Sequence, residues 1–349
     1  MQIKYSPEIF LGMTKKNKIL ITGSVGFIGF HLTNELLENG YDVIGIDNLN
    51  DYYEVSLKKN RLKLLKKNSQ NTKGNFKFHK IDLCNQKKLK SIFFKKEIKT
   101  IVHLAAQAGV RYSLQNSQAY VDSNLNGFSN ILNLAKEIDA EHFLFASSSS
   151  VYGKNKKIPF SESDKTDNPV SFYAATKKSN EVLAYSYSHL YNLPITGMRF
   201  FTVYGPYGRP DMAYFNFTKS ILQGKEIKIF NNGKMKRDFT HIDDAVRAIK
   251  SLIFEKPDIK NQLGTSATAP YAIYNIGNNN PVTLLKFVQL IEKSTGIKAK
   301  KKLINNQLGD VPITYADISK IKTKTGFFPK IKLEDGINEF VKWYISYFK

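Results

Sequence analysis

Cysteine and long hydrophobic runs are nearly absent from this sequence of 349 residues. The single cysteine, Cys84, excludes an intramolecular disulfide framework and suits a reducing compartment. No stretch approaches the roughly 20 apolar residues of a membrane span, so we expect no membrane segment. Residues 1–17 are mixed polar and lack the apolar centre of a signal peptide. We therefore expect an N-terminal extension over residues 1–17 and a cytoplasmic location.

Arginine is also scarce, although the formal net charge is +22. Only six of the 52 basic residues are arginine, and the lysines lie in scattered helical runs. Proteins that read nucleic acid grooves favour arginine for its two-pronged contacts with bases, so we expect no nucleic acid partner. A solvated lysine-rich surface, or a field that attracts small anionic substrates, explains the charge better. The six histidines lack metal-site spacing, and we expect no metal.

Short apolar runs alternate with helical patterns in the first 200 residues. This alternation predicts an α/β fold with a doubly wound parallel sheet. After about Gly205 the alternation weakens, which indicates a smaller C-terminal α/β region over the carboxyl edge of the sheet, where ligands bind. We expect a cofactor domain over residues 18–200, with returning segments near 238–280, and a substrate domain mainly over 201–349. The runs read as strands are Lys18–Thr22, Tyr41–Asp47, Phe76–Ile81, Ile101–Leu104, Phe143–Ser147 and Ile195–Arg199, and the main helical patterns are Ser117–Ile138 and Tyr173–Leu190.

Three glycines, Gly23, Gly26 and Gly29, follow the first predicted strand and open a helix that stops at Gly40. Such a loop lets a dinucleotide diphosphate approach the backbone at a helix N-terminus, although a plain strand-to-helix turn gives the same pattern. Asp47 ends the second strand, where a carboxylate grips the adenosine ribose and repels a 2′-phosphate. The pattern therefore favours NAD over NADP. Asp82, after the third strand, is placed to meet the adenine or to cap a helix.

A second set of residues carries reactive groups. Ser148 ends the fifth strand, and Tyr173 and Lys177 lie four apart on one helical face. A lysine ammonium beside a phenol lowers the phenol pKa, which would make Tyr173 a general base. Tyrosine and lysine are common here, so the pair alone could arise by chance. Its separation from the serine run and the glycine loop makes that explanation weak.

Together these residues resemble the extended short-chain dehydrogenase/reductase family, also described as NAD-dependent epimerases and dehydratases. Longer stretches resemble its UDP-glucuronate 4-epimerase branch, and the similarity runs from about Lys18 to the C-terminus. They are Gly45–Tyr53 (GIDNLNDYY), Gln107–Ser113 (QAGVRYS), Ser147–Gly153 (SSSSVYG), Val170–Lys178 (VSFYAATKK), Arg199–Met212 (RFFTVYGPYGRPDM) and Gly233–Asp244 (GKMKRDFTHIDD).

The resemblance implies a Rossmann-type fold and a UDP-sugar 4-epimerase with tightly bound NAD. Tyr173 would take the proton of the sugar 4-hydroxyl while NAD accepts hydride, with Lys177 and Ser148 assisting. The implied cofactor residues are Gly23, Gly26, Phe27, Ile28, Gly29, Asp47, Asn48, Asp82, Leu83, Leu104, Ala105, Ala106, Gln107, Asn124 and Lys177. The implied substrate residues are Arg111, Ser113, Ser148, Ser149, Ser150, Tyr173, Thr202, Arg209, Arg237 and Asp310, whereas Arg199 is expected to brace a strand end.

Ser149 and Ser150 bear on the choice of reaction. Related dehydratases carry an aspartate at the first position, and dehydratases and decarboxylases carry a glutamate at the second. Hydroxyls there, with Thr202, suit a substrate carboxylate, and we expect interconversion of UDP-glucuronate and UDP-galacturonate for surface polysaccharide. Another UDP-hexose or UDP-N-acetylhexosamine 4-epimerase, a UDP-glucuronate decarboxylase and a non-enzymatic NAD-binding regulator remain open. The resemblance also implies a homodimer built on the two helical stretches named above.

Overall fold

Seven parallel strands form the central sheet of the computed structural model, which describes residues 18–93, 97–259, 266–305 and 311–348. The strand order is β10-β6-β5-β4-β1-β2-β3. Strands β2 and β3 are added on one side of β1, and the later strands are added on its other side, so the order of strands reverses beside β1. Buried apolar residues fill most of these strands, as a sheet covered on both faces requires. The strands are β1 (Lys18–Thr22), β2 (Val43–Asp47), β3 (Phe76–Lys80), β4 (Ile98–His103), β5 (His142–Ser148), β6 (Ile195–Phe200) and β10 (Tyr271–Ile276).

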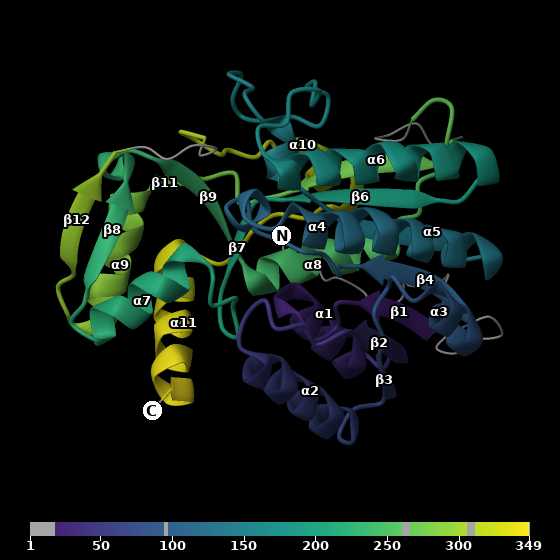
Figure 1. Cartoon of the computed structure of the whole chain (residues 1–349), viewed down its shortest axis with the longest axis horizontal. Helices are drawn as coiled ribbons and strands as arrows, with labels where there is room; N and C mark the ends of the chain where they lie inside the picture. The colour runs from purple at the N-terminus through teal and green to yellow at the C-terminus, as the bar shows by residue number, and fades with distance from the viewer. Residues whose placement is uncertain (1–17, 94–96, 260–265, 306–310, 349) are drawn as a thin grey trace, which may run out of the picture.

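Helices cover both faces of this sheet (Figure 1). One face of the sheet packs against α1 (Phe27–Glu38), α2 (Val55–Ser69), α8 (Ile242–Ile253) and α10 (Ser319–Thr325). The other face packs against α3 (Gln86–Phe93), α5 (Gly127–Glu137) and α6 (Phe172–Tyr191). The predicted doubly wound parallel sheet is therefore confirmed. In the described residues no helix combines the length and hydropathy needed to cross a bilayer.

The C-terminal region has its own apolar core and lies beside the carboxyl edge of the large sheet (Figure 1). A parallel pair, β8 and β12, packs with three helices. A second small sheet, β11-β9-β7, joins this region to the large sheet. Its elements are β7 (Thr202–Tyr204), α7 (Ala213–Leu222), β8 (Glu226–Phe230), β9 (Lys236–His241), β11 (Pro281–Thr283), α9 (Leu284–Thr295), β12 (Lys300–Ile304) and α11 (Leu333–Phe348).

Two helix starts place residues of interest. Ser171 caps α6 by accepting a hydrogen bond from the Ala174 backbone N–H at 3.1 Å, which sets Tyr173 in the first turn. The predicted Ser117–Ile138 helix is interrupted: α4 (Ser117–Tyr120) passes into a π-helical turn over Val121–Asn126 before α5. Such turns are frequent at functional sites, and this one directs Asn124 towards the loop after β4.

Candidate active site

A cavity of about 460 Å³ runs along the carboxyl edge of the large sheet. Its lining comes from the ends of β1 to β6, the first turns of α1 and α6, and the segment after β7. Most residues singled out in the sequence line it: Gly23, Gly26, Phe27, Ile28, Gly29, Asp47, Asn48, Asp82, Leu83, Leu104, Ala105, Ala106, Gln107, Ser148, Ser149, Ser150, Tyr173, Lys177, Thr202, Arg209 and Arg237. Asn124, Arg111 and Ser113 do not, and Asp310 lies outside the described residues.

The glycine loop leaves no room for side chains. Gly23 has a φ of +69°, and a Cβ there would lie 2.8 Å from the Ala105 backbone nitrogen. A Cβ on Gly29 would lie 2.0 Å from the Gly23 carbonyl oxygen. Gly26 precedes α1, and no side chain caps that helix. Free backbone N–H groups and a helix N-terminus therefore face the cavity, which fits the diphosphate of a dinucleotide.

Asp47 sits at the end of β2 with its carboxyl buried. Its Oδ1 accepts a hydrogen bond from the Leu49 backbone N–H at 2.8 Å. Burial raises the pKa of Asp47, while that hydrogen bond and the charges of Lys58 and Arg61 act to lower it. Lys58 also lines the cavity, and its Nζ donates to the Asn50 carbonyl oxygen at 2.8 Å. The carboxylate expected to meet a ribose thus has a buried lysine near it that the sequence analysis did not single out.

Asp82 and Asn48 meet across two strand ends. Asn48 Nδ2 donates to Asp82 Oδ2 at 3.0 Å, and the Cys84 backbone N–H donates to Oδ1 at 2.8 Å. Burial acts to raise the pKa of Asp82, but these hydrogen bonds hold it below its usual value. Asp82 thus stays ionised and forms a polar edge to the cavity.

Asn124 lies behind the cavity rather than in its lining. It receives a hydrogen bond from the Gln107 backbone N–H at 2.8 Å and donates one to the Gln107 carbonyl oxygen at 3.0 Å. Asn180 on α6 donates in turn to the Asn124 carbonyl oxygen at 2.6 Å. Asn124 therefore fixes the course of the loop that places Ala105, Ala106 and Gln107 in the lining.

Tyr173, Lys177 and Ser148 converge in the cavity. Burial raises the pKa of Tyr173, while hydrogen bonding with Ser148 and the charge of Arg209 act to lower it. Lys177 is 2% exposed, and its Nζ donates to the Ala146 carbonyl oxygen at 2.9 Å. Burial lowers the pKa of Lys177 to about 8, against the opposing charge of Glu181. Burial thus dominates the pKa of Tyr173, and the groups that act to lower it are Ser148 and Arg209. A lowering by Lys177 together with a bound nicotinamide stays a prediction.

The serine run turns at the end of β5. Ser148 Oγ accepts from the Ser150 backbone N–H and donates to the Ser150 hydroxyl, both at 3.2 Å. This caps a short 3₁₀ turn over Ser149–Tyr152. Ser149, Ser150 and Thr202 all line the cavity, so three hydroxyls face the same cavity as Tyr173 without an acidic side chain in their positions.

The arginine candidates differ in their surroundings. Arg209 forms a two-pronged ion pair with Asp211, which also accepts from the Tyr52 hydroxyl at 3.1 Å. Arg237 donates to the Lys236 carbonyl oxygen at 2.9 Å. Arg111 is exposed, and its guanidinium lies 4.6 Å from the centre of the Phe230 ring.

Ser113 is buried and is used by its own loop. It donates to the Val110 carbonyl oxygen at 2.6 Å, at the start of a 3₁₀ turn. Neither Ser113 nor Arg111 is brought together with the cavity hydroxyls.

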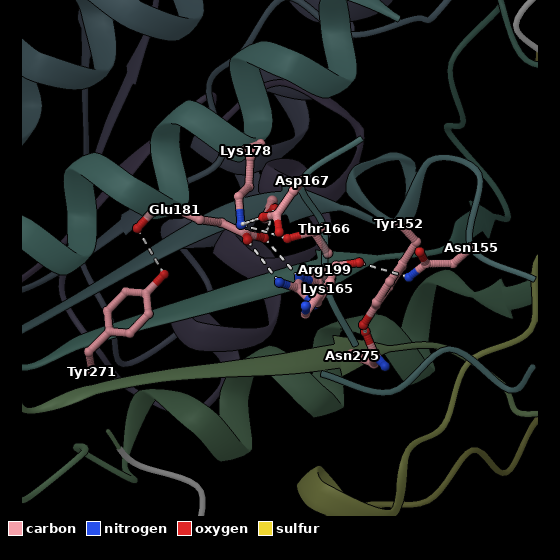
Figure 2. A network of polar contacts seen from close by, with 11 residues as sticks. Tyr152, Asn155, Lys165, Thr166, Asp167, Lys178, Glu181, Arg199, Tyr271 and Asn275 are labelled. Carbon is pink, nitrogen blue, oxygen red and sulfur yellow. Dashed lines mark hydrogen bonds and ion pairs between the residues drawn. The ribbon is translucent and has the colours of Figure 1, made fainter. Parts of the chain in front are cut away.

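A buried ion pair supports the ends of β5 and β6 (Figure 2). Arg199 donates twice to the Glu181 carboxylate at 2.9 Å, and both side chains are almost fully buried. Ser147, next to Ser148, donates to the same carboxylate at 2.6 Å. Arg199 thus braces the strand end as expected, and Glu181, which the sequence analysis missed, lies one turn after Lys177 on α6.

One group of potential metal ligands occurs among the described residues, namely His241, Asp243 and Glu339. It lies outside the cavity lining. His241 Nδ1 accepts from the Asp243 backbone N–H at 3.3 Å, and this caps α8. The buried imidazole therefore has a structural role at a helix start.

Comparisons with known proteins agree with this fold. The sequence profile of the GDP-mannose 4,6 dehydratase family matches residues 20–340. This chain therefore belongs to that family, within the extended short-chain dehydrogenases/reductases. Protein CapI of Staphylococcus aureus is 50% identical over 95% of this chain and 99% of its own.

Two further relatives carry specific names. A probable UDP-glucuronate 4-epimerase of Rhizobium meliloti is 45% identical over 94% of this chain and 96% of its own. The crystal structure of UDP-glucuronic acid 4-epimerase from Bacillus cereus, in complex with UDP-glucuronic acid and NAD, matches with a TM-score of 0.83 and 34% identity. That match covers 95% of this chain and 99% of the Bacillus chain.

Proposed function

We propose that this chain is an NAD-dependent UDP-glucuronate 4-epimerase that interconverts UDP-glucuronate and UDP-galacturonate. The observation that carries the proposal is the meeting of Tyr173, Lys177 and Ser148 with three uncharged hydroxyls in one cavity. The glycine loop at the other end of that cavity fits a dinucleotide. Relatives of this chain include an epimerase solved with NAD and UDP-glucuronic acid, which supports the same ligands here.

In the proposed reaction Tyr173 transfers the proton, and neighbouring side chains orient Tyr173 and the substrate. When bound, NAD supplies a reversible hydride acceptor for sugar carbon 4 and a positive charge that favours the phenolate. Tyr173 removes the proton from the 4-hydroxyl and returns it after the 4-keto sugar has turned over. Ser148, which acts to lower the pKa of Tyr173, shares the hydrogen bond to that oxygen. Lys177 holds the cofactor side of the site through its buried, charged end.

The hydroxyls of Ser149, Ser150 and Thr202 are proposed to hold the substrate carboxylate. The oxidised sugar is a β-keto acid, which loses carbon dioxide when the carboxylate bond aligns with the ketone π system. Hydrogen bonds from fixed hydroxyls keep the carboxylate out of that alignment. The absence of acidic side chains at Ser149 and Ser150 supports epimerisation over dehydration or decarboxylation.

The arginines are proposed to receive the diphosphate of the UDP group. Arg209 and Arg237 both line the cavity, and a planar guanidinium matches phosphate oxygens in pairs. Arg209 pairs with Asp211 in the free protein, so we propose that the diphosphate competes with that carboxylate. Asp310, Arg111 and Ser113 are retained only as proposals for outer contacts.

Product analysis tests the proposal. Purified protein is supplied separately with UDP-glucuronate, UDP-glucose and UDP-N-acetylglucosamine, and the products are resolved by chromatography. We expect UDP-galacturonate from the first substrate and little turnover of the other two. Preferred turnover of a neutral sugar would favour another UDP-hexose 4-epimerase, since neutral hydroxyls also suit a hydroxymethyl group, and a UDP-pentose product would favour the decarboxylase.

A tyrosine variant tests the assigned base. Tyr173→Phe should lower turnover by about 10²- to 10⁴-fold, because it removes the acid–base group. Tyr187→Phe is the matched control, since that hydroxyl lies on the same helix, outside the cavity, and bonds to Asn133 at 2.8 Å. Wild-type turnover by the Tyr173 variant would show that the base has been misassigned.

A cytoplasmic homodimer completes the proposal. Helix α6 leaves apolar side chains exposed, including Val182 at 56% and Leu190 at 65%. A stripe of this kind on one helix supports pairing with the same helix of a second copy, beside α4 and α5. Sedimentation of the purified protein measures the mass directly, and a monomer at micromolar concentration would remove the dimer from the proposal.

A further inference from the structure

Arg61 on α2 joins two loops that face the two ends of the cavity. Its side chain is 0% exposed. Nη1 donates to the Val25 carbonyl oxygen, inside the glycine loop, at 3.0 Å. Nη2 donates to the carbonyl oxygens of Tyr207 at 2.6 Å and Gly208 at 3.3 Å. One guanidinium therefore connects the glycine loop to the residues directly before Arg209.

The charge of Arg61 is unusual for so buried a group. Among the residues that the structure describes, no carboxylate forms an ion pair with it, and its remaining acceptor is the Tyr53 hydroxyl at 2.8 Å. A buried charge is unfavourable unless polar groups surround it. The Asp47 carboxylate, whose pKa the charge of Arg61 acts to lower, and the carbonyls of the two loops stabilise the guanidinium, and the carbonyls tie it to the position of both loops.

Two more side chains hold the same segment from the glycine-loop side of the protein. His31 on α1 lies 2.9 Å from the Pro206 carbonyl oxygen through Nε2. Burial lowers the pKa of His31 to about 4, so the ring is neutral, and because a carbonyl only accepts, Nε2 carries the donated proton. Tyr52 donates to Asp211, the partner of Arg209. Residues 206–211 are thus anchored at three points.

We propose that Arg61 is a positioning residue that fixes the Arg209 segment against the glycine loop, and that the affinity for UDP depends on this link although Arg61 does not line the cavity. This inference rests on the proposed function for its ligand, a nucleoside diphosphate. The guanidinium fork spans the two loops because Nη1 donates to one and Nη2 to the other, whereas all donors of a lysine ammonium leave from one nitrogen. When the fork is lost, residues 206–211 keep the hydrogen bonds of His31 and Tyr52 and the packing of the Tyr207 ring against Phe30 and Trp343, but Arg209 loses its direct link to the cofactor loop.

Calorimetric titration of the NAD-loaded protein with UDP tests the proposal. Arg61→Met should weaken UDP binding by about tenfold to a hundredfold, as expected for lost hydrogen bonds to a charged group. Arg61→Lys keeps the charge but not the fork, and should weaken it by about tenfold. In both variants KM for the sugar nucleotide should rise while kcat per bound NAD changes by less than about threefold. Bound NAD and the thermal midpoint are measured on the same samples.

Arg247→Met is the matched control. That arginine on α8 pairs with the buried Asp244 and does not line the cavity, so its loss should lower the thermal midpoint and leave UDP affinity unchanged. If Arg61→Met fails to fold, Arg61→Lys and His31→Gln carry the test, with a smaller loss of affinity expected from the second.

Two outcomes separate this inference from the proposed function. Unchanged UDP affinity in the Arg61 variants, with a lowered thermal midpoint and normal turnover, would overturn the link and leave the epimerase standing. Wild-type protein that binds UDP but does not turn over UDP-glucuronate would overturn the proposed function alone, and weaker UDP binding in the variants would still support the link.

Discussion

The two ends of the cavity are lined by different kinds of chemical group. At the glycine-loop end the part expected to meet the diphosphate is backbone, namely uncapped helix N–H groups, glycines without room for a Cβ, and the loop at Ala105, with the side chains of Asp47 and Asp82 beside it. At the other end it is made of side chains on connecting segments, such as Arg209, Arg237 and Thr202. Arg209 already has a carboxylate partner there. The fold itself therefore fixes the positions of the groups at the glycine-loop end. The positions of the groups at the other end depend on side-chain contacts that can be exchanged for others.

The largest effect should follow from adding a methyl group to Gly23, at the glycine-loop end of the cavity. Gly23→Ala should lose bound NAD and at least about 100-fold in turnover, because its Cβ would meet the Ala105 backbone and neither loop can move without shifting a strand. Gly224→Ala is the matched control: its φ of +65° is similar to the +69° of Gly23, but nothing lies within 4 Å of its Cβ.

The control should cost only about 1 kcal/mol of stability and keep its cofactor. Absorbance of the purified proteins measures bound dinucleotide. Equal NAD content in the two variants would show that crowding at the glycine loop does not affect cofactor binding.

A smaller effect is expected at the side-chain-built end. Ser149→Ala and Thr202→Ala should each raise KM for UDP-glucuronate by about tenfold and increase the fraction of UDP-pentose, because a hydrogen bond to the carboxylate is lost. Ser163→Ala removes an exposed hydroxyl outside the cavity and is the control. Chromatography of the products gives both values, and constant product ratios would count against a carboxylate held by these hydroxyls.

The smallest effect concerns pH at the junction of the two ends. Because burial lowers the pKa of Lys177 to about 8, its ammonium group loses its proton at a lower pH than the ammonium group of an ordinary lysine does. We expect kcat to decline above about pH 8, and the decline to shift to higher pH in Lys177→Arg, which stays charged. The pH profile of kcat for the two proteins measures this. A decline at the same pH in both would assign it to another group.

The order of strands and helices in the large sheet was predictable because most of its strands contain a short apolar run, and even β3, which alternates apolar and polar residues, has a strand pattern. The predicted first strand, Lys18–Thr22, matches β1, and the helix after it ends at Glu38, just before Gly40, whose backbone N–H donates to the Leu37 carbonyl oxygen. β4 begins at Ile98 rather than Ile101, since the polar Lys99 and Thr100 interrupt the apolar pattern although Thr100 is fully buried. β10 was not recognised as a strand, because its place beside β6 depends on a pairing between distant segments.

Contacts within the site were less predictable. The sequence placed Tyr173, Lys177 and the serine run together because helix and strand periods fix their faces. It did not show that Asn124 would support Gln107, or that Arg61 would bind carbonyls 146 and 147 residues away. Such links depend on how loops approach in space, and a single sequence carries no local signal for them. The effect of the Arg209 charge on Tyr173, which opposes the rise in its pKa caused by burial, has the same origin.

The return of the chain to the large sheet has a consequence for protein engineering. β6 pairs on one side with β10, and α8 packs against α1, so residues after the C-terminal region begins complete the first core. A fragment cut after β6 would expose that strand as a bare edge and uncover the apolar side of α1. Chimaeras that exchange the sugar-recognition part among relatives should therefore keep residues 242–253, 271–276 and 319–325 with the host scaffold, and exchange the segments between them rather than everything after one cut.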